Sequence, residues 1–387
     1  MNKHGWTYKK LSEVCHPKKD IKRASKHYKS DDYISYIDIS SIDNKNNVIT
    51  ETTRYAFCDA PSRAQQIVCS DDVIISMVRP NLKNIAMVRE GSNLVASSGF
   101  CVLRSRPEVN PSFLFSFVKS TRFTNYLISR VSGANYPAVR ESDIINFSIP
   151  VPSMEEQEAI VAELDEITEA IEALQQQVAD LDALAQSTFY TMFGDPVTNP
   201  KGWEVKKLEE IASSKIGLTY KPANVCDNGV IVLRSSNIQN SSIELSDTVR
   251  VNVAIPDNKW VRDGDILMCT RNGSFRLVGK VARINNLPER MTYGAFMTVI
   301  RSEYKDYLFA FFNSPAFRSQ LGSAGTATIN QITVRMLNNI NVPVPPLNLQ
   351  LEFAAKVKAI ELTKDEINAQ IAEMQTLLSS RMDYYFD

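Results

Sequence analysis

The sequence predicts an α+β protein: two similar domains joined by two long helices that pair as an antiparallel coiled coil with approximate two-fold symmetry. Three observations lead to this prediction. The same landmarks recur about 193 residues apart, each domain mixes strand-like and helix-like segments, and a long heptad pattern follows each domain. The predicted domains are residues 1–152 and 196–346, and the predicted helices are residues 153–195 and 347–387.

Short motifs carry the repeat. The opening Gly5-Trp6, which is followed by Lys-Lys-Leu and Glu, returns at Gly202-Trp203. The hinge Pro150-Val-Pro152 returns as Pro343-Val-Pro345. A period of this length is far too long for a solenoid unit, so it indicates a duplicated domain.

Within each domain, runs rich in β-branched and apolar residues precede a segment with helical spacing. In the first domain we expect strands at Tyr33–Ile39, Val73–Val78 and Val95–Leu103, and a helix over Pro111–Arg130. In the second domain we expect strands at Val230–Leu233, Ile266–Cys269 and Phe296–Ile300, and a helix near Lys305–Leu321.

Each domain is followed by a long predicted helix. The first starts at a capping box, Ser153 to Glu156, and extends to Phe193, which is roughly 60 Å at 1.5 Å per residue. A 4-3 alternation of apolar residues predicts a coiled coil. The spacer residues are Ile160, Leu164, Ile167, Ile171, Leu174, Val178 and Leu181 in the first helix, and Phe353, Val357, Ile360, Ile367, Ile371 and Met374 in the second.

One heptad position of the second helix is polar. Lys364 occupies the a position where the first helix has Ile171. A polar residue at this position can fix the register or orientation of a coiled coil at a cost in stability. Alternatively, the aliphatic part of the lysine packs in the seam and the ammonium reaches solvent.

The net charge of −1 conceals an alternation along the chain. Residues 1–150 carry 21 Lys and Arg against 14 Asp and Glu, and residues 201–346 carry 18 against 12. Residues 151–200 carry eleven acidic side chains and no Lys or Arg. Two basic domains can bind phosphate, whereas an acidic helix is repelled by it. We therefore expect the exposed side of the first helix to face protein or solvent.

The sequence lacks the motifs of several enzyme classes. There is no Gly-Lys-Ser/Thr phosphate loop, and three histidines near the N-terminus leave no plausible Ser/His/Asp set. Asn110-Pro-Ser-Phe113 is similar to a methyltransferase box, but no S-adenosylmethionine loop accompanies it, so a helix start is favoured. The six cysteines form no CxxC pair, so free thiols and no metal site are expected.

Together, these features resemble the specificity subunit of type I restriction-modification systems. The resemblance rests on the openings at Trp6 and Trp203, the Ile-Pro-Val-Pro-x-x-x-Glu-Gln pattern of Ile149–Gln157, and Phe193-Gly194-Asp195 at the end of the first helix. It covers essentially the whole chain. It departs from the family at Leu349, where Glu is favoured, and there we expect helix capping to shift to Asn348.

The resemblance implies that each domain is a target-recognition domain for one half of a split double-stranded DNA sequence, with the helices as a spacer. It implies a cytoplasmic chain without catalysis or cofactor, and without membrane contact. Two modification subunits would dock on it and carry S-adenosylmethionine-dependent adenine methylation, and restriction subunits would use ATP and magnesium for translocation and cleavage. Two alternatives are a coiled-coil scaffold that never touches nucleic acid, and a self-sufficient methyltransferase or nuclease.

The candidate DNA-binding residues are polar and lie mostly in loops, where Arg suits guanine and Asn suits adenine. In the first domain they are Lys18, Lys19, Lys22, Arg23, Arg79, Asn81, Lys83, Asn135, Tyr136 and Arg140. In the second domain they are Thr219, Lys221, Arg234, Asn237, Arg271, Asn272, Ser274, Arg276, Thr328 and Asn330. The alternatives are an ordinary solvated segment for the lysine-rich stretch, and turns with surface ion pairs for Arg79 and Arg271.

Overall fold

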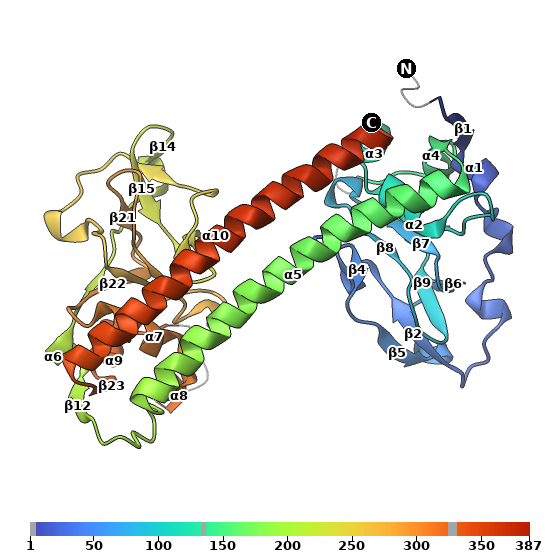
Figure 1. The fold of residues 1–387 in the computed structure, drawn as a ribbon. Coiled ribbons are helices and arrows are strands. Elements are labelled where there is room, and N and C mark those ends of the chain that lie inside the picture. Colours follow the sequence, from blue (N-terminus) through green and yellow to red (C-terminus); the bar gives the residue numbers. More distant parts are fainter. Residues whose placement is uncertain (1–4, 133–136, 324–330) are drawn as a thin grey trace. The chain divides into compact units, whose positions relative to one another are not determined.

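The computed structural model describes residues 5–132, 137–323 and 331–387. It divides into two compact units, residues 1–175 with 369–387 and residues 176–368 (Figure 1). Each unit holds one α+β domain together with parts of both long helices. The predicted fold class, two similar α+β domains joined by two long helices, is confirmed.

The first unit is built around two sheets and a cluster of helices. One sheet has the strand order β5-β2-β9-β6, with β2 and β9 parallel, and the other has the order β10-β7-β8. The strands are β1 (Thr7–Lys10), β2 (Tyr33–Ile37), β3 (Ile42–Asp43), β4 (Val48–Ile49), β5 (Thr53–Ala56), β6 (Ala64–Ile67), β7 (Val73–Ser76), β8 (Ile85–Met87), β9 (Leu94–Ser97), β10 (Phe100–Leu103) and β11 (Ser148–Val151). The helices are α1 (Leu11–Val14), α2 (Pro111–Val118), α3 (Thr121–Arg130), α4 (Glu141–Ile145) and the start of α5 (Met154–Phe193).

The second unit repeats this plan. Its sheets have the orders β13-β22-β19-β20 and β14-β18-β15-β21, again with one parallel pair, β15 and β21. The strands are β12 (Glu204–Lys207), β13 (Ser213–Ile216), β14 (Val225–Cys226), β15 (Val230–Leu233), β16 (Ile238–Gln239), β17 (Ser242–Ile243), β18 (Arg250–Val251), β19 (Ile266–Cys269), β20 (Val281–Arg283), β21 (Thr292–Tyr293), β22 (Met297–Arg301) and β23 (Asn341–Val344). The helices are α6 (Leu208–Ile211), α7 (Lys305–Asn313), α8 (Pro315–Ser323), α9 (Val334–Asn338) and the start of α10 (Leu347–Phe386).

The repeated motifs occupy the same places in both units. The strand after the opening tryptophan pairs antiparallel with the Pro-Val strand before the long helix, as β1 with β11 and as β12 with β23. The two prolines of these pairings, Pro150 and Pro343, lie opposite Tyr8 and Val205. The duplication read from the sequence is therefore a duplication of structure.

Three of the expected elements are interrupted. The apolar run Val95–Leu103 forms two strands, β9 and β10, in different sheets. The break falls at Ser97-Ser98-Gly99, residues typical of a turn, which interrupt the apolar run between two fully buried strands. The expected helix over Pro111–Arg130 is divided at Ser120, whose hydroxyl caps α3, and the helix near Lys305–Leu321 is divided before Pro315.

The helix starts are local features that the sequence predicts well. Asn110 caps α2 through its side-chain oxygen, which accepts from the backbone N–H groups of Ser112 and Phe113, so this motif is a helix start. At α5, the Ser153 hydroxyl accepts from the Glu156 backbone N–H, and the Glu156 carboxylate accepts from the Ser153 N–H. The expected shift of capping to Asn348 is wrong, because α10 already begins at Leu347.

The end of each long helix completes the core of a domain. In the first unit, Phe386 of α10 packs edge-on against Phe113 and Phe117 of α2. In the second unit, Phe193 of α5 packs against Tyr307 and Phe353. Phe193 and Phe386 are equivalent positions of the two helices. Each domain core thus includes the end of the helix that follows the other domain.

The predicted heptad positions are inside the helix packing. Ile160, Leu164, Ile167 and Ile171 are buried, and the remaining spacer positions of α5 are half-buried. In α10, Phe353, Val357, Ile360 and Ile367 are buried, and Ile371 and Met374 are half-buried.

The two helices run antiparallel within each unit. In the first unit, Glu163 of α5 pairs with Arg381 of α10. In the second unit, Asp182 of α5 accepts from the Lys364 ammonium at 2.5 Å. The side chain of Lys364 is only 15% exposed, so it lies in the seam while its charge is paired. The packed stem agrees with one expectation for Lys364, although the ammonium pairs with Asp182 instead of only reaching solvent; a role in fixing the register stays a prediction.

Candidate nucleic-acid interface

The most prominent polar loops of the two domains close equivalent β-hairpins. In the first domain, β7 and β8 form the hairpin, and the Ser76 N–H donates to the Asn84 carbonyl at 2.9 Å where the loop begins. In the second domain, β19 and β20 form it, and the Gly279 N–H donates to the Cys269 carbonyl at 2.8 Å. We call these loops, residues 77–83 and 270–278, the first and second hairpin loops.

The first hairpin loop is held by short polar contacts. Arg79 and Lys83 adopt the left-handed conformation, each with φ of 50°, and the turn Pro80–Leu82 lies between them. The side-chain amides of Asn44 and Asn47, from the β3–β4 turn, donate to the carbonyls of Leu82 and Lys83, both at 2.9 Å. Non-glycine residues with positive φ are uncommon and concentrate at functional sites.

The second hairpin loop uses different contacts. The Asn272 amide donates to the Ser235 hydroxyl at 3.0 Å, and its oxygen accepts from the Ser274 N–H at 3.0 Å. The Arg271 guanidinium lies over the Phe296 ring, 5.1 Å from its centroid. The Asn272 side chain therefore stabilises the conformation of the loop, whereas the contact with the Phe296 ring fixes the orientation of the Arg271 guanidinium.

Further candidate residues lie between the domain helices and the Pro-Val strand, and this part of the chain lies beside each hairpin loop. In the first domain, Ala138 forms a β-bridge with Val78, and the Arg79 N–H donates to the Pro137 carbonyl at 2.8 Å. In the second domain, Gln331 forms the equivalent bridge with Arg271. The candidates on the hairpin loops and those near Ala138 and Gln331 were predicted from separate parts of the sequence, and the fold places them next to each other. The candidates Asn135, Tyr136, Thr328 and Asn330 lie outside the described residues.

The arginines of the hairpin loops have no acidic partner. Arg79, Arg271 and Arg276 are exposed, and no carboxylate of the described chain forms an ion pair with them. This disfavours the alternative that these loops are turns held by surface ion pairs. Asn81 and Ser274 are also exposed, whereas Lys83 is half-buried and donates to the Lys119 carbonyl at 3.3 Å.

The remaining candidates of the first domain are on the surface. Lys19, Lys22 and Arg23 are exposed on short turns before β2, and Arg140 is exposed before α4. Lys18, in the same basic stretch, pairs with Glu141. The stretch is therefore accessible to phosphate, except that Lys18 already forms an ion pair.

Two candidates of the second domain are structural. Asn237 is fully buried, and its amide donates to the carbonyls of Glu244 and Asp247 at 2.9 and 2.8 Å, so it is not available to a base edge. Arg234 is half-buried and pairs with Asp247 at 2.9 Å. Both were candidates because they are polar, but their polar groups stabilise a turn within the domain. Thr219 and Lys221 are exposed.

Sequence reasoning missed the exposed apolar residues of the hairpin loops. Leu82 is 41% exposed and Phe275 is 60% exposed, and each lies in the short turn of its hairpin loop. Phe296, beneath Arg271, is 56% exposed. In the sequence such residues are indistinguishable from core residues, so no signal identified them.

A buried ion pair anchors the base of each hairpin. The Arg104 guanidinium donates to both carboxylate oxygens of Asp72 at 2.7 Å, and Asp72 is 1% exposed. In the second domain, Arg301 makes the same two-bond contact with Asp265 at 2.7 and 2.9 Å. The hydrogen bonds to the aspartates raise the pKa of both guanidinium groups.

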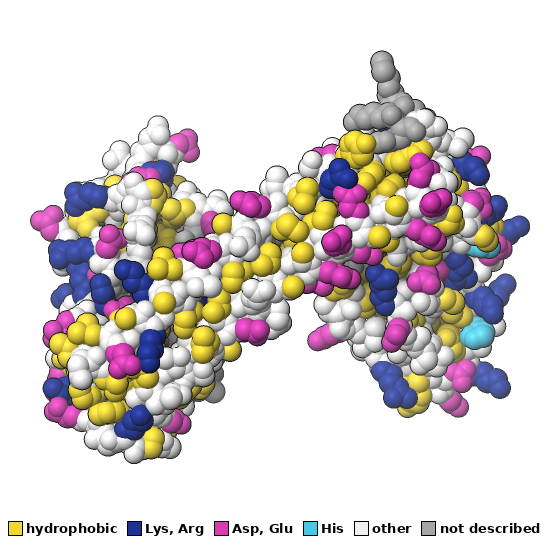
Figure 2. All heavy atoms as spheres, in the orientation of Figure 1, with side chains coloured by type: hydrophobic (Ala, Val, Ile, Leu, Met, Phe, Trp, Pro, Cys, Tyr) yellow, Lys and Arg dark blue, Asp and Glu magenta, His cyan; other side chains and the backbone are white. Residues whose placement is uncertain are grey.

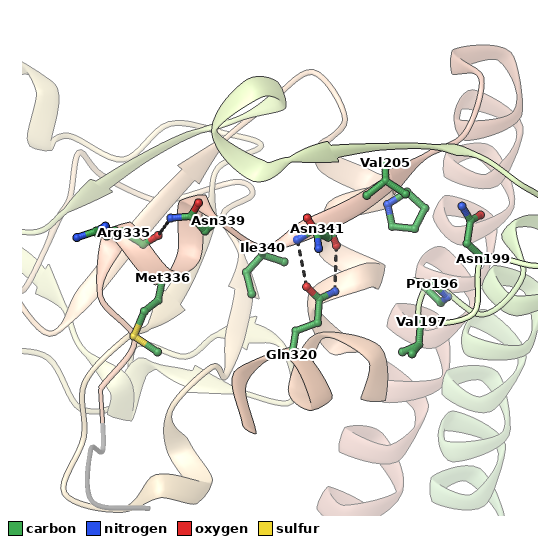
Figure 3. Close-up of a pocket in the computed structure, with 11 residues that line it drawn as sticks. Pro196, Val197, Asn199, Val205, Gln320, Arg335, Met336, Asn339, Ile340 and Asn341 are labelled. Atoms are coloured by element: carbon green, nitrogen blue, oxygen red, sulfur yellow. Dashed lines mark hydrogen bonds between the residues drawn. The ribbon is translucent and has the colours of Figure 1, made fainter. Parts of the chain in front are cut away.

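A hollow of about 590 Å³ in the second domain is lined by no residue of the hairpin loop among those that the structure describes (Figure 3). Gln320 of α8 crosses it and exchanges hydrogen bonds of 2.9 and 3.0 Å with the Asn341 backbone. Its wall contains one charged residue, Arg335. None of the predicted site residues lines it.

Charge is distributed as the sequence indicated. On the face shown in Figure 2, acidic side chains follow the long helices, and most Lys and Arg side chains lie over the domains. Within the described residues, no group of three or more His, Cys, Asp or Glu side chains is placed to hold a metal ion. In the same part of the chain, no helix has the length and apolar character that a bilayer crossing requires.

Comparison with known proteins identifies the family. A family model described as the type I restriction modification DNA specificity domain matches the chain twice, over residues 3–181 and 200–374. The chain belongs to this family. The two matches fall on the two copies of the repeat, so the chain is a specificity subunit with two such domains.

Individual relatives are distant in sequence. The EcoKI specificity subunit of Escherichia coli (strain K12) is 28% identical over 188 residues, which span 46% of this chain and only 40% of that protein. The StySPI specificity subunit of Salmonella potsdam is 22% identical over 97% of this chain and 86% of its own. A chain from a structural study of complex assembly and conformational transition of the type I restriction-modification system is 28% identical, with a TM-score of 0.61 and coverage of 99% and 98%.

Proposed function

We propose that this specificity subunit selects the DNA sites of a type I restriction-modification complex by reading a bipartite sequence, one half with each hairpin loop and the segment beside it. The observation that carries the proposal is the pair of equivalent hairpin loops. Each presents an exposed arginine without an acidic partner, and a second predicted segment adjoins each of them.

The side chains of the loops suit this role. Each loop presents an exposed arginine, and arginine forms bidentate contacts with guanine in the major groove. Other exposed basic residues of the first domain, such as Lys19 and Arg23, would contact phosphates, which supplies affinity and salt dependence but no sequence information. A loop tip can also change its sequence while the hairpin beneath it, anchored by the Asp72–Arg104 pair or its equivalent, stays in place.

The test is the sequence read by each domain. Methylated adenines are first mapped in cells with and without this gene, which defines the target. Arg79→Ala and Arg271→Ala should each weaken discrimination at one base pair by about 1–3 kcal/mol, in different halves of the target. The matched controls are Arg89→Ala and Arg262→Ala, which remove exposed arginines from the opposite ends of the same hairpins.

The outcome that contradicts the proposal is also defined. If Arg271→Ala leaves the methylation pattern and the binding preference unchanged, the second hairpin loop does not read bases there. If binding to DNA fails to weaken as salt is added, even with the modification subunit present, the scaffold alternative is favoured.

We further propose that chemistry resides on partner subunits. The acidic exposed side of α5 would face two modification subunits, which bind S-adenosylmethionine, while restriction subunits bind ATP and magnesium. This chain would remain a non-catalytic cytoplasmic component. The purified chain, given S-adenosylmethionine and target DNA, should then transfer no methyl groups until the modification subunit is added. Transfer by the chain alone would support the self-sufficient methyltransferase.

A further inference from the structure

The hairpin loops carry a feature that arginine readout does not explain. The first loop has Leu82, the last residue of its turn Pro80–Leu82, and the second has Phe275, the first residue of its turn Phe275–Leu277; both side chains are exposed. The backbone at each residue is fixed: the Leu82 N–H donates to the Arg79 carbonyl at 2.9 Å, and the Val278 N–H donates to the Phe275 carbonyl at 3.1 Å. A large apolar side chain is thus presented to solvent from an ordered turn in both domains.

The neighbourhood of Phe275 indicates what it meets. Arg276 follows it directly, and Arg271, which stacks on the exposed ring of Phe296, begins the same loop. A protein-binding apolar patch is usually depleted of charge at its centre, whereas these aromatic rings alternate with cations that no carboxylate of the described chain pairs with. That alternation fits a polyanion whose surface also has apolar spots.

DNA offers one such spot at a base edge in the major groove, the 5-methyl group of thymine. Insertion of a side chain between base pairs, in contrast, is a feature of proteins that bind the minor groove. Because Arg271 and Arg276 of the same loop suit guanine edges in the major groove, the loop between β19 and β20 favours the methyl contact.

We propose that Phe275 is a specificity-determining residue that packs on a thymine 5-methyl group of the half-site read by the second domain, with Phe296 positioning Arg271 for the neighbouring base. Leu82 makes the corresponding, smaller contact for the first domain. The proposal rests on the proposed function, since it assigns a chemical class of contact to the same interface.

The experiment removes the methyl group from the DNA. Each thymine of the mapped target is replaced singly by deoxyuracil, and binding of the complex with the modification subunit is measured at constant salt. For the wild-type chain, one replacement in the second half-site should weaken binding about three- to fivefold. Phe275→Ala should weaken binding to the thymine duplex by a similar factor and abolish the response to that one replacement.

Leu82→Ala serves as the matched control, because it should leave the response in the second half-site intact and alter one in the first. Phe296→Ala should reduce discrimination at the base pair assigned to Arg271 without changing the deoxyuracil response.

Three results would overturn the proposal. One is an equal deoxyuracil response in the wild type and Phe275→Ala; another is a second half-site without thymine on either strand. The third is loss of assembly with the modification subunit in Phe275→Ala with DNA discrimination intact, which would make the loop a protein contact. Failure of the wild type to bind any target specifically is a separate result, because it rejects the proposed function itself.

Discussion

The two domains share the contacts at the base of the hairpin, which we call the frame, and differ at the tips of the hairpin loops. The frame includes the Asp72–Arg104 pair and its equivalent, Asp265–Arg301, which make the same two-bond contacts. At the tips, the first domain stabilises Arg79 in a left-handed turn, whereas the second stacks Arg271 on Phe296. The comparison teaches that contacts at the base of the hairpin are the same in both domains, while those at its tip are not, as expected if the tips read different sequences.

The largest expected effect comes from breaking the shared frame. Asp72→Ala or Asp265→Ala leaves a largely buried guanidinium without its carboxylate, and each should lower the free energy of unfolding by about 3 kcal/mol. Each aspartate also accepts a backbone N–H, from Cys69 or Arg262, at 2.8 Å. Urea unfolding of the two variants should give similar losses, because the contacts are equivalent.

A matched control is Asp71→Asn, which neutralises an exposed carboxylate next to the buried one and keeps a residue type that tolerates the left-handed backbone there, φ 69°. It should change stability little. A loss in one domain several times larger than in the other would show that the two frames are not energetically equivalent.

How far the sequence led depended on whether the signal was local. The helix expected over residues 153–195 forms over Met154–Phe193, because heptads and a capping box are written in consecutive positions. Arg79 and Arg271 were placed on loops because strand patterns precede them. The break between β9 and β10 was missed although Ser97-Ser98-Gly99 marks it, because the prediction followed the apolar residues on either side, which show no alternation.

The errors at the candidate site have a common cause. The burial of Asn237, the pairing of Arg234 with Asp247 and the exposure of Phe275 all depend on which distant segment covers the residue. Residue type alone suggested the opposite in each case. Tertiary packing therefore decides which polar side chains remain available for binding and which apolar ones join them.

The next largest effect is a difference in stability loss between two equivalent glutamines, Gln157 and Gln350, at the starts of the long helices. Gln157 is fully paired: its oxygen accepts from the Asn110 N–H at 2.8 Å, and its amide donates to the carbonyls of Glu108 and Pro152 at 3.0 Å. Gln350 donates to Pro345 at 2.7 Å, but its buried oxygen has no hydrogen-bond partner in the described chain. Gln157→Leu should cost about 2 kcal/mol and Gln350→Leu less than about 1.

Thermal unfolding of both variants measures this difference. Gln176→Leu, on the exposed side of α5, is the control for changing a glutamine to leucine within a helix. Equal losses for Gln157→Leu and Gln350→Leu would mean that the unpaired oxygen of Gln350 costs nothing.

A smaller effect is expected where the second helix departs from the first. Lys364→Ile gives α10 the residue that α5 has at Ile171, and its partner Asp182 is 62% exposed, so the aspartate left behind can be hydrated. Replacing a seam ion pair by an apolar residue is often neutral or stabilising, so unfolding should be unchanged or about 1 kcal/mol more favourable to the folded state. Asp182→Asn, which leaves the lysine in the seam with only the longer 3.7 Å contact to Glu361, should destabilise instead. Destabilisation by Lys364→Ile exceeding that of Asp182→Asn would contradict this.

The smallest effect is a pH dependence that differs between the two interhelical ion pairs. Hydrogen bonds from Arg381 and then from Tyr385 lower the pKa of Glu163 below its ordinary value of 4.5. A lowered folded-state pKa contributes stability above the unfolded value and loses it as the pH falls. For Lys364, burial opposes the charge, but the hydrogen bond to Asp182 and nearby carboxylates outweigh it and raise the pKa above 10.5.

The Lys364 contribution is therefore present below the unfolded value and lost in alkali. The stability difference between the wild type and Glu163→Gln should vanish in acid, and that between the wild type and Lys364→Met should change only in alkali. Urea unfolding across pH measures both. The two ion pairs should therefore affect stability at opposite ends of the pH scale. The same pH dependence of stability in both variants would show that neither ion pair causes it.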